Sequence, residues 1–231
     1  MNETEGNSIN EYLKEGDYSI VTPEITNILK DIPGEGLEYL EKVNTLMQKN
    51  LVLKYGTADR YSRDSQAILF NSQKELNKDK NGGILIGGCT ESARLLRTAS
   101  LFKQIPSRLI ETVSTEWLNL AKPQYIENPN AFRGHVFVEV FIDGEWFVIN
   151  HTIYSPTKRE NPKWIGKRNG NKIKLGNSEE FEIVCEGVDH MNMKTPEGDS
   201  VKFLNNNDFH SFIRKRYFER WKKIAKSKIP I

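Results

Sequence analysis

The chain has 231 residues, enough for one sizeable hydrophobic core with a small appendage. Hydrophobic residues make up 37%, charged residues 28% and the net charge is +2, so composition indicates a polar-surfaced globular protein and favours no nucleic-acid partner. No apolar run approaches the roughly 18 residues that span a bilayer, and the first residues lack the pattern of a secretory signal. With two cysteines far apart in the chain, we expect no disulfide framework, no membrane span and a cytoplasmic location.

Residues 1–35 are expected to form a polar N-terminal segment with one short helix. Thr22 is typical of a helix cap and Pro23 of a first helical position, and the helix is expected to stop before Pro33. Apolar residues at helical spacing predict a second helix that ends near residue 51. Residues 60–80 have a polar, helical pattern.

A third helix is predicted to begin at Cys89, which follows a pair of glycines. Its apolar stripe consists of Ala93, Leu96, Ala99 and Phe102. The N–H groups and the dipole at a helix start favour an anion, which lowers the pKa of a thiol toward the reactive thiolate. The same N–H groups can face an oxyanion. A buried cysteine that only packs has the same local pattern.

A strand over 108–113 and a loop over 119–134 precede a predicted hairpin that carries two polar candidates. Asp143-Gly144 is a strong two-residue turn signal. The register that this turn sets makes His135 and Asn150 diagonal neighbours on one face, with His151 on the opposite face. The Asn150 side chain can then accept the imidazole N–H and leave the other nitrogen for a thiol.

The last third, residues 156–231, is expected to be an extension with strands and a basic helix, packed on the core. Cys185 alternates like a strand residue over 181–186 and is predicted to be core, and residues 201–204 are a candidate strand. Asp208 is a candidate cap for the final helix. Residues 211–231 carry eight Lys or Arg against one Glu, which leaves a nucleic-acid or membrane-surface role open; we favour a packed amphipathic helix with a solvated basic face.

Metal or cofactor chemistry is not indicated by the sequence. The four histidines show no paired-ligand spacing, and the chain has no Cys-x-x-Cys. No glycine-rich phosphate loop ends in Lys followed by Ser or Thr. We therefore expect neither a metal nor a cofactor.

Three blocks of the sequence resemble the transglutaminase-like superfamily, over roughly residues 40–155. They are the Gly-Gly-Cys helix with its Ile-Pro exit (87–110), the His135 strand, and Val-Ile-Asn-His-Thr (148–152). The resemblance implies an α+β, papain-like core over 36–155, with helices on an antiparallel sheet and the nucleophile at a helix N-terminus. It implies an oxyanion site formed by the Cys89 N–H with Tyr55 or Gln73. The chain departs from the family in having Asn150 where Asp is usual and Phe137 where Trp is common.

Together these features predict a cysteine-dependent amidase or peptidase with Cys89, His135 and Asn150 as its catalytic group. The substrate would be a peptide or protein amide, attacked through a thioester. Two alternatives stay open. One is a transglutaminase-type acyltransferase, in which an amine replaces water, and the other is a binding or scaffolding module that keeps the fold without turnover.

Overall fold

A computed structural model of the chain describes residues 9–53, 64–70, 84–120, 134–151, 164–175 and 179–227. It is an α+β fold around an eight-stranded antiparallel sheet with the order β10-β9-β8-β3-β4-β5-β6, in which β7 also pairs with β8. The strands are β3 (Ser107–Ser114), β4 (Gly134–Ile142), β5 (Glu145–Ile149), β6 (Ile165–Gly166), β7 (Lys172–Ile173), β8 (Phe181–Asp189), β9 (Asn192–Lys194) and β10 (Ser200–Val201). A separate parallel pair joins β1 (Leu51–Leu53) to β2 (Ile84–Ile86).

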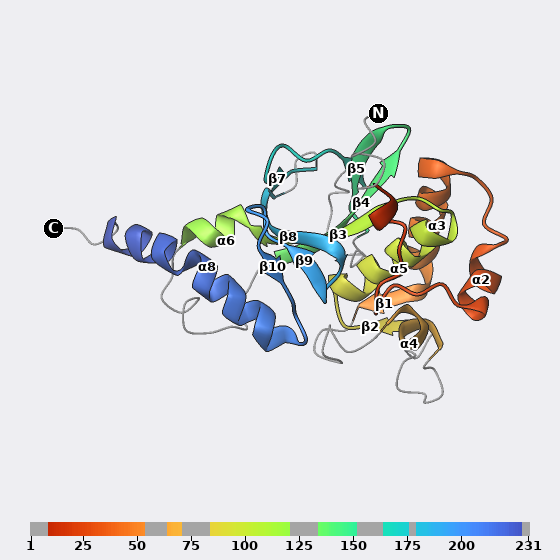
Figure 1. The fold of residues 1–231 in the computed structure, drawn as a ribbon, viewed down its shortest axis with the longest axis horizontal. Helices are drawn as coiled ribbons and strands as arrows, with labels where there is room; N and C mark the ends of the chain where they lie inside the picture. Colours follow the sequence, from red (N-terminus) through yellow and green to blue (C-terminus); the bar gives the residue numbers. More distant parts are fainter. Residues whose placement is uncertain are drawn as a thin grey trace.

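Helices cover one side of this sheet and one end of it (Figure 1). They are α2 (Pro23–Leu29), α3 (Gly36–Asn50), α4 (Ser65–Phe70), α5 (Cys89–Phe102), α6 (Thr115–Leu120) and α8 (Asn206–Ser227). Helix α5 packs on β3 and β4, while α2, α3 and α4 pack against α5. As predicted, the Thr22 hydroxyl caps α2 by accepting a hydrogen bond from the Ile25 N–H, and Pro23 occupies the first turn.

Helix α5 is buried on all of its faces, where the sequence predicted a single apolar stripe. Every residue from Thr90 to Leu101 is buried, including two arginines and a glutamate. The reason is its position as a middle layer between the sheet and the outer helices. Several of its polar side chains make internal hydrogen bonds; Arg97, for example, donates to the carbonyl oxygens of Ser107 and Lys14.

The hairpin of β4 and β5 has the predicted register. Phe141 pairs with Trp146 and Ile142 with Glu145. Asp143 and Gly144 both have positive φ, 53° and 84°, as the two central residues of a type I′ turn require. Valines at alternate positions of β4 face the α5 side, in the larger core. Phe137 points to the other side, into a smaller core with five buried partners: Ile110, Val148, Ile173, Leu175 and Ile183.

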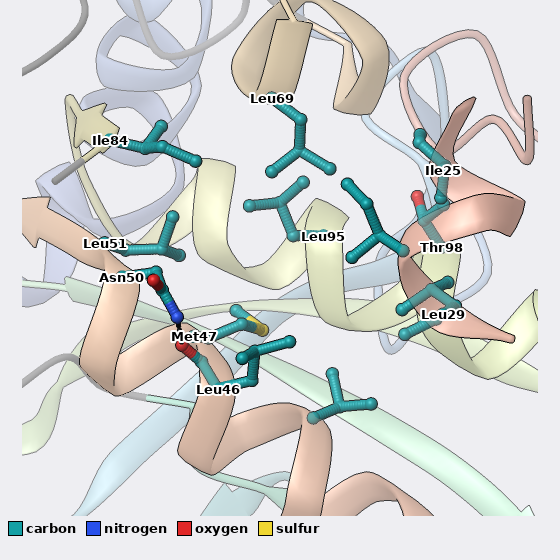
Figure 2. A pocket seen from close by; sticks show the side chains of 13 residues that line it. Ile25, Leu29, Leu46, Met47, Asn50, Leu51, Leu69, Ile84, Leu95 and Thr98 are labelled. Atoms are coloured by element: carbon teal, nitrogen blue, oxygen red, sulfur yellow. Dashed lines mark hydrogen bonds between the residues drawn. The ribbon is translucent and has the colours of Figure 1, made fainter. Parts of the chain in front are cut away.

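An apolar cavity of about 280 Å³ lies within the helical layer. Figure 2 shows side chains from α2, α3, β1, α4, β2 and α5 around it, with Leu95 and Thr98 contributed by α5. Nearly all lining atoms are carbon. The Asn50 amide donates to the Leu46 carbonyl oxygen across 2.8 Å, and the Thr98 hydroxyl is 2.5 Å from the Ser65 hydroxyl. Because its lining comes from α5, the outer helices and the β1–β2 pair, the cavity lies on the outer side of α5, away from the large sheet.

The C-terminal region differs from the prediction at its boundaries. Asn205, not Asp208, caps α8: its side-chain oxygen accepts the Asp208 N–H, while the Asp208 carboxylate accepts the Leu204 N–H. The strand predicted over 201–204 reduces to β10, which ends at Val201, and the helical pattern of 60–80 gives α4 within the described residues. The apolar stripe of α8 is confirmed: Phe209, Ile213, Tyr217 and Trp221 are buried.

Candidate active site

Cys89 is the first residue of α5 and is partly exposed. Gly88 is the N-cap residue, so no side chain of a cap covers the helix start. The buried Glu91 carboxylate accepts the Gly87 N–H across 2.6 Å and fixes the turn that leads into the helix. The N–H groups of a first helical turn point out of the helix, and the helix dipole favours negative charge there. The sulfur of Cys89 thus sits where an anion is stabilised.

The structure brings His135, near the start of β4, into direct contact with Asn150. The distance from His135 Nε2 to Asn150 Oδ1 is 3.1 Å. A carbonyl oxygen only accepts hydrogen bonds, so Nε2 carries the proton and Nδ1 of the neutral ring is left with a lone pair. Asn150 lies just beyond the end of β5, where its own N–H donates to the Trp164 carbonyl oxygen across 2.7 Å.

Aromatic rings surround the His135 imidazole. The Phe137 ring meets it edge-on with centroids 4.6 Å apart, and the Phe181 ring lies at 6.1 Å. Loss of solvation in these surroundings lowers the pKa of His135 to about 4, although the Asn150 hydrogen bond and the charge of Glu111 act in the opposite direction. The imidazole is therefore neutral near pH 7, the state in which it can accept a proton.

The prediction that His151 faces away from His135 is wrong. Their rings are stacked, with centroids 5.4 Å apart and planes 29° from parallel. Strand alternation holds only while the ladder continues, and β5 ends at Ile149. Beyond it, the Asn150 N–H bonds to the Trp164 carbonyl oxygen, and His151 is fully buried against His135.

His151 also connects the two parts of the candidate site. Its Nε2–H donates to the Val136 carbonyl oxygen across 2.7 Å, and its Nδ1 lies 2.8 Å from the Ser92 hydroxyl. Ser92 is one helical turn after Cys89, and its hydroxyl is also 3.0 Å from the Cys89 carbonyl oxygen. The first turn of α5 and the His135–Asn150 pair are thus joined through Ser92 and His151. Sequence reasoning missed both residues; the available signals were the position of Ser92 three residues after Cys89 and that of His151 directly after Asn150.

A second buried polar cluster lies between α5 and the sheet. His190 Nε2–H donates to Glu111 across 2.9 Å, and Arg94 is 3.3 Å from His190 Nδ1. The Arg94 guanidinium also lies 4.1 Å from the centroid of the Tyr18 ring. Burial lowers the pKa of His190 despite the adjacent Glu111. This cluster anchors α5 to β3 and places the negative charge that acts on His135.

The remaining predicted residues divide into two groups. Cys185 is fully buried on β8, as predicted, and burial raises the pKa of its thiol well above the usual value. A thiol in that state is unreactive. Tyr55 and Gln73, the candidate oxyanion donors, lie outside the described residues.

Comparison with known proteins gives a likeness of fold. No family model matches the chain, and no curated protein matches it. A solved structure, the "Putative Cysteine Protease from Cytophaga hutchinsonii", is similar with a TM-score of 0.51 and 12% sequence identity. The likeness covers 82% of this chain and 48% of that one, so this chain spans about half the length of that protein. Among the described helices, none is both long enough and apolar enough to cross a membrane.

Proposed function

We propose that this chain is a cysteine-dependent amidase or peptidase that acts on a peptide-like amide through a thioester. Cys89 is the nucleophile, His135 the general base and acid, and Asn150 the group that orients His135. The observation that carries the proposal is the hydrogen bond from His135 Nε2–H to Asn150 Oδ1, in a pair that is linked to the first turn of α5 through the contacts of His151 with His135 and with Ser92. The resemblance to the transglutaminase-like superfamily and the fold likeness to the Cytophaga hutchinsonii protein support it.

The reaction follows from the protonation states of these groups. His135 Nδ1 accepts the Cys89 thiol proton as the sulfur forms a bond to the substrate carbonyl carbon. The negative charge moves to the carbonyl oxygen, where N–H groups at the start of α5 stabilise it. When this intermediate collapses, the C–N bond breaks and His135 returns the proton to the leaving amine. The product at this stage is a thioester on Cys89.

The second half repeats these steps with water. His135 removes a proton from water, the oxygen attacks the thioester carbon, and the C–S bond breaks to release a carboxylic acid and the thiol. Asn150 keeps Nε2 protonated throughout, so Nδ1 is the nitrogen that works. An amide stabilises the imidazolium less than a carboxylate does. If an amine replaces water in this half, the same thioester yields a new amide, which is the transglutaminase-type outcome.

Thiol labelling tests the proposal without a known substrate. Iodoacetamide at neutral pH, followed by mapping of the adduct, should modify Cys89 much faster than Cys185, and His135→Ala should slow the Cys89 reaction. Cys185 serves as an internal reference because it is fully buried. Equal rates at the two thiols, with no effect of His135→Ala, would show that Cys89 is an ordinary cysteine. Addition of a primary amine to an active preparation would then separate hydrolysis from amine transfer.

A further inference from the structure

The structure points to a further role for His151: we infer that it is a positioning residue that holds the start of α5 and the His135 ring in register. It contacts the helix through Ser92, the strand through Val136 and the base through stacking on His135. The inference rests on the proposed function, because it assigns His151 to the geometry of that same site. His151 acts through its neighbours and takes no part in bond making.

The hydrogen-bond pattern fixes the tautomer of His151. The Val136 carbonyl oxygen can only accept, so Nε2 carries the proton and Nδ1 has a lone pair. The single proton of the Ser92 hydroxyl is then shared between Nδ1, at 2.8 Å, and the Cys89 carbonyl oxygen, at 3.0 Å. Burial, together with the nearby His135, lowers the pKa of His151 to about 3. The ring therefore stays neutral, and its pattern of one donor and one acceptor is constant around neutral pH.

Each ring nitrogen of His151 makes a hydrogen bond to a different part of the site. Ser92 lies on the same helical face as Cys89, one turn later, so its bond to Nδ1 restrains the rotation of the helix start. Val136 is the next residue after His135, so the bond from Nε2 restrains the strand at the base itself. A displacement of α5 along the sheet would break one of these bonds inside a dry interior, where an unpaired polar group is costly.

The stacking contact restrains the remaining freedom of His135. One face of its imidazole lies against His151 with centroids at 5.4 Å, and the Phe137 edge lies at 4.6 Å. The Asn150 bond fixes Nε2, so rotation of the ring would break a hydrogen bond and two ring contacts at once. The charged group that acts on His135 is Glu111, on β3, whose carboxylate accepts a hydrogen bond from His190. His151, which stays neutral near pH 7, adds no charge beside His135.

The test is the pH dependence of Cys89 alkylation in Ser92→Ala, from about pH 5.5 to pH 10. Without the Ser92 hydroxyl, we expect the rate near neutral pH to fall about tenfold, because a small displacement of reacting groups has effects of this size. Above about pH 9.5 the rate should return to the wild-type value, since an unassisted thiol ionises near pH 8.5. Ser100→Ala is the matched control: this buried serine of α5 donates to the Leu96 carbonyl oxygen and should leave the profile unchanged.

A second variant, His151→Phe, removes both hydrogen bonds and keeps a stacked ring, so it should give the same shifted profile. Absence of Cys185 labelling shows that a variant is folded. Profiles of both variants that overlay the wild type, or a rate loss that persists above pH 9.5, would overturn the positioning role. In either case a slow reaction of His135→Ala would leave the proposed function standing. If His135→Ala also overlays the wild type, the proposed function itself fails.

Discussion

Moderate acid should destabilise this protein well before its carboxylates titrate. His135 and His151 have pKa values lowered to about 4 and about 3, from an ordinary value of 6.5. In the unfolded chain they take up protons as the pH falls through 6.5, while in the folded protein they stay neutral until the pH approaches those lowered values. The unfolded state therefore binds more protons in this window, and the free energy of unfolding falls as the pH falls.

The size of the effect follows from these two values. pH 5 lies 1.5 units below the ordinary histidine pKa, so a histidine of the unfolded chain is almost fully protonated there. This protonation stabilises the unfolded state by about 2 kcal/mol for each histidine that stays neutral in the fold. The two histidines together should therefore reduce the free energy of unfolding by about 4 kcal/mol between pH 7.5 and pH 5. The lowered pKa of His190 adds to this in the same direction. A loss of this size is a large share of the stability of a typical domain.

Urea denaturation at pH 7.5, 6 and 5, followed by tryptophan fluorescence, measures this change. Trp117 and Trp221 are buried with their rings in edge contact, so unfolding should alter their emission. His151→Gln, which keeps an N–H donor toward Val136 and has no titrating ring, should lose about 2 kcal/mol of the pH dependence. Stability that stays flat or rises between pH 7.5 and pH 5 would refute the conclusion that these histidines stay neutral in the folded protein.

Three further changes test the site and its support. Asn150→Ala should slow Cys89 alkylation or turnover, whereas Asn150→Asp should retain or raise it because a carboxylate stabilises the imidazolium better; identical rates in both variants would make Asn150 a bystander. Leu96→Ala should reduce the free energy of unfolding, measured by urea denaturation, more than Leu95→Ala, by about 4 against about 2 kcal/mol, because Leu96 has no exposed surface while Leu95 already borders the cavity; equal losses would contradict this. Gly187→Ala should destabilise severely, since a Cβ would overlap the Asn192 backbone oxygen; an unchanged melting temperature would refute it.

The parts of the fold that sequence predicts best are those that local rules determine. Asp143-Gly144 specifies its turn, and the turn sets the pairing of β4 with β5. Because pairing and alternation are fixed together, the contact between His135 and Asn150 follows from counting residues along two strands. The cap of α2 and the core position of Cys185 have equally local signals.

The parts that sequence does not predict depend on where the local pattern ends. Strand alternation does not predict the face of His151 correctly, because alternation holds only within a paired strand and β5 ends at Ile149. Helix α6 follows β3 directly and has no counterpart in the sequence prediction; only its last two residues fall within the loop predicted over 119–134. The burial of Arg94 and Arg97 depends on segments outside α5, because Arg94 lies against Tyr18 and His190 while Arg97 donates to the carbonyl oxygen of Lys14. Nothing within α5 therefore reveals that both arginines lie inside the protein.

The features that the sequence does not predict share a physical cause, and this cause bears on how such a site is built. A nucleophile at the end of a helix and a base on a strand come from separate elements, and apolar packing alone lets a helix slide or rotate with little change in buried area. Directional hydrogen bonds remove that freedom, because an unmatched buried donor is costly. Ser92, Arg94 and Arg97 each bond to a different segment of the chain: the turn after β5, the end of β8, and the N-terminal segment with β3. The buried polar side chains of α5 thus fix the position of its first residue, Cys89, relative to the strand that carries His135.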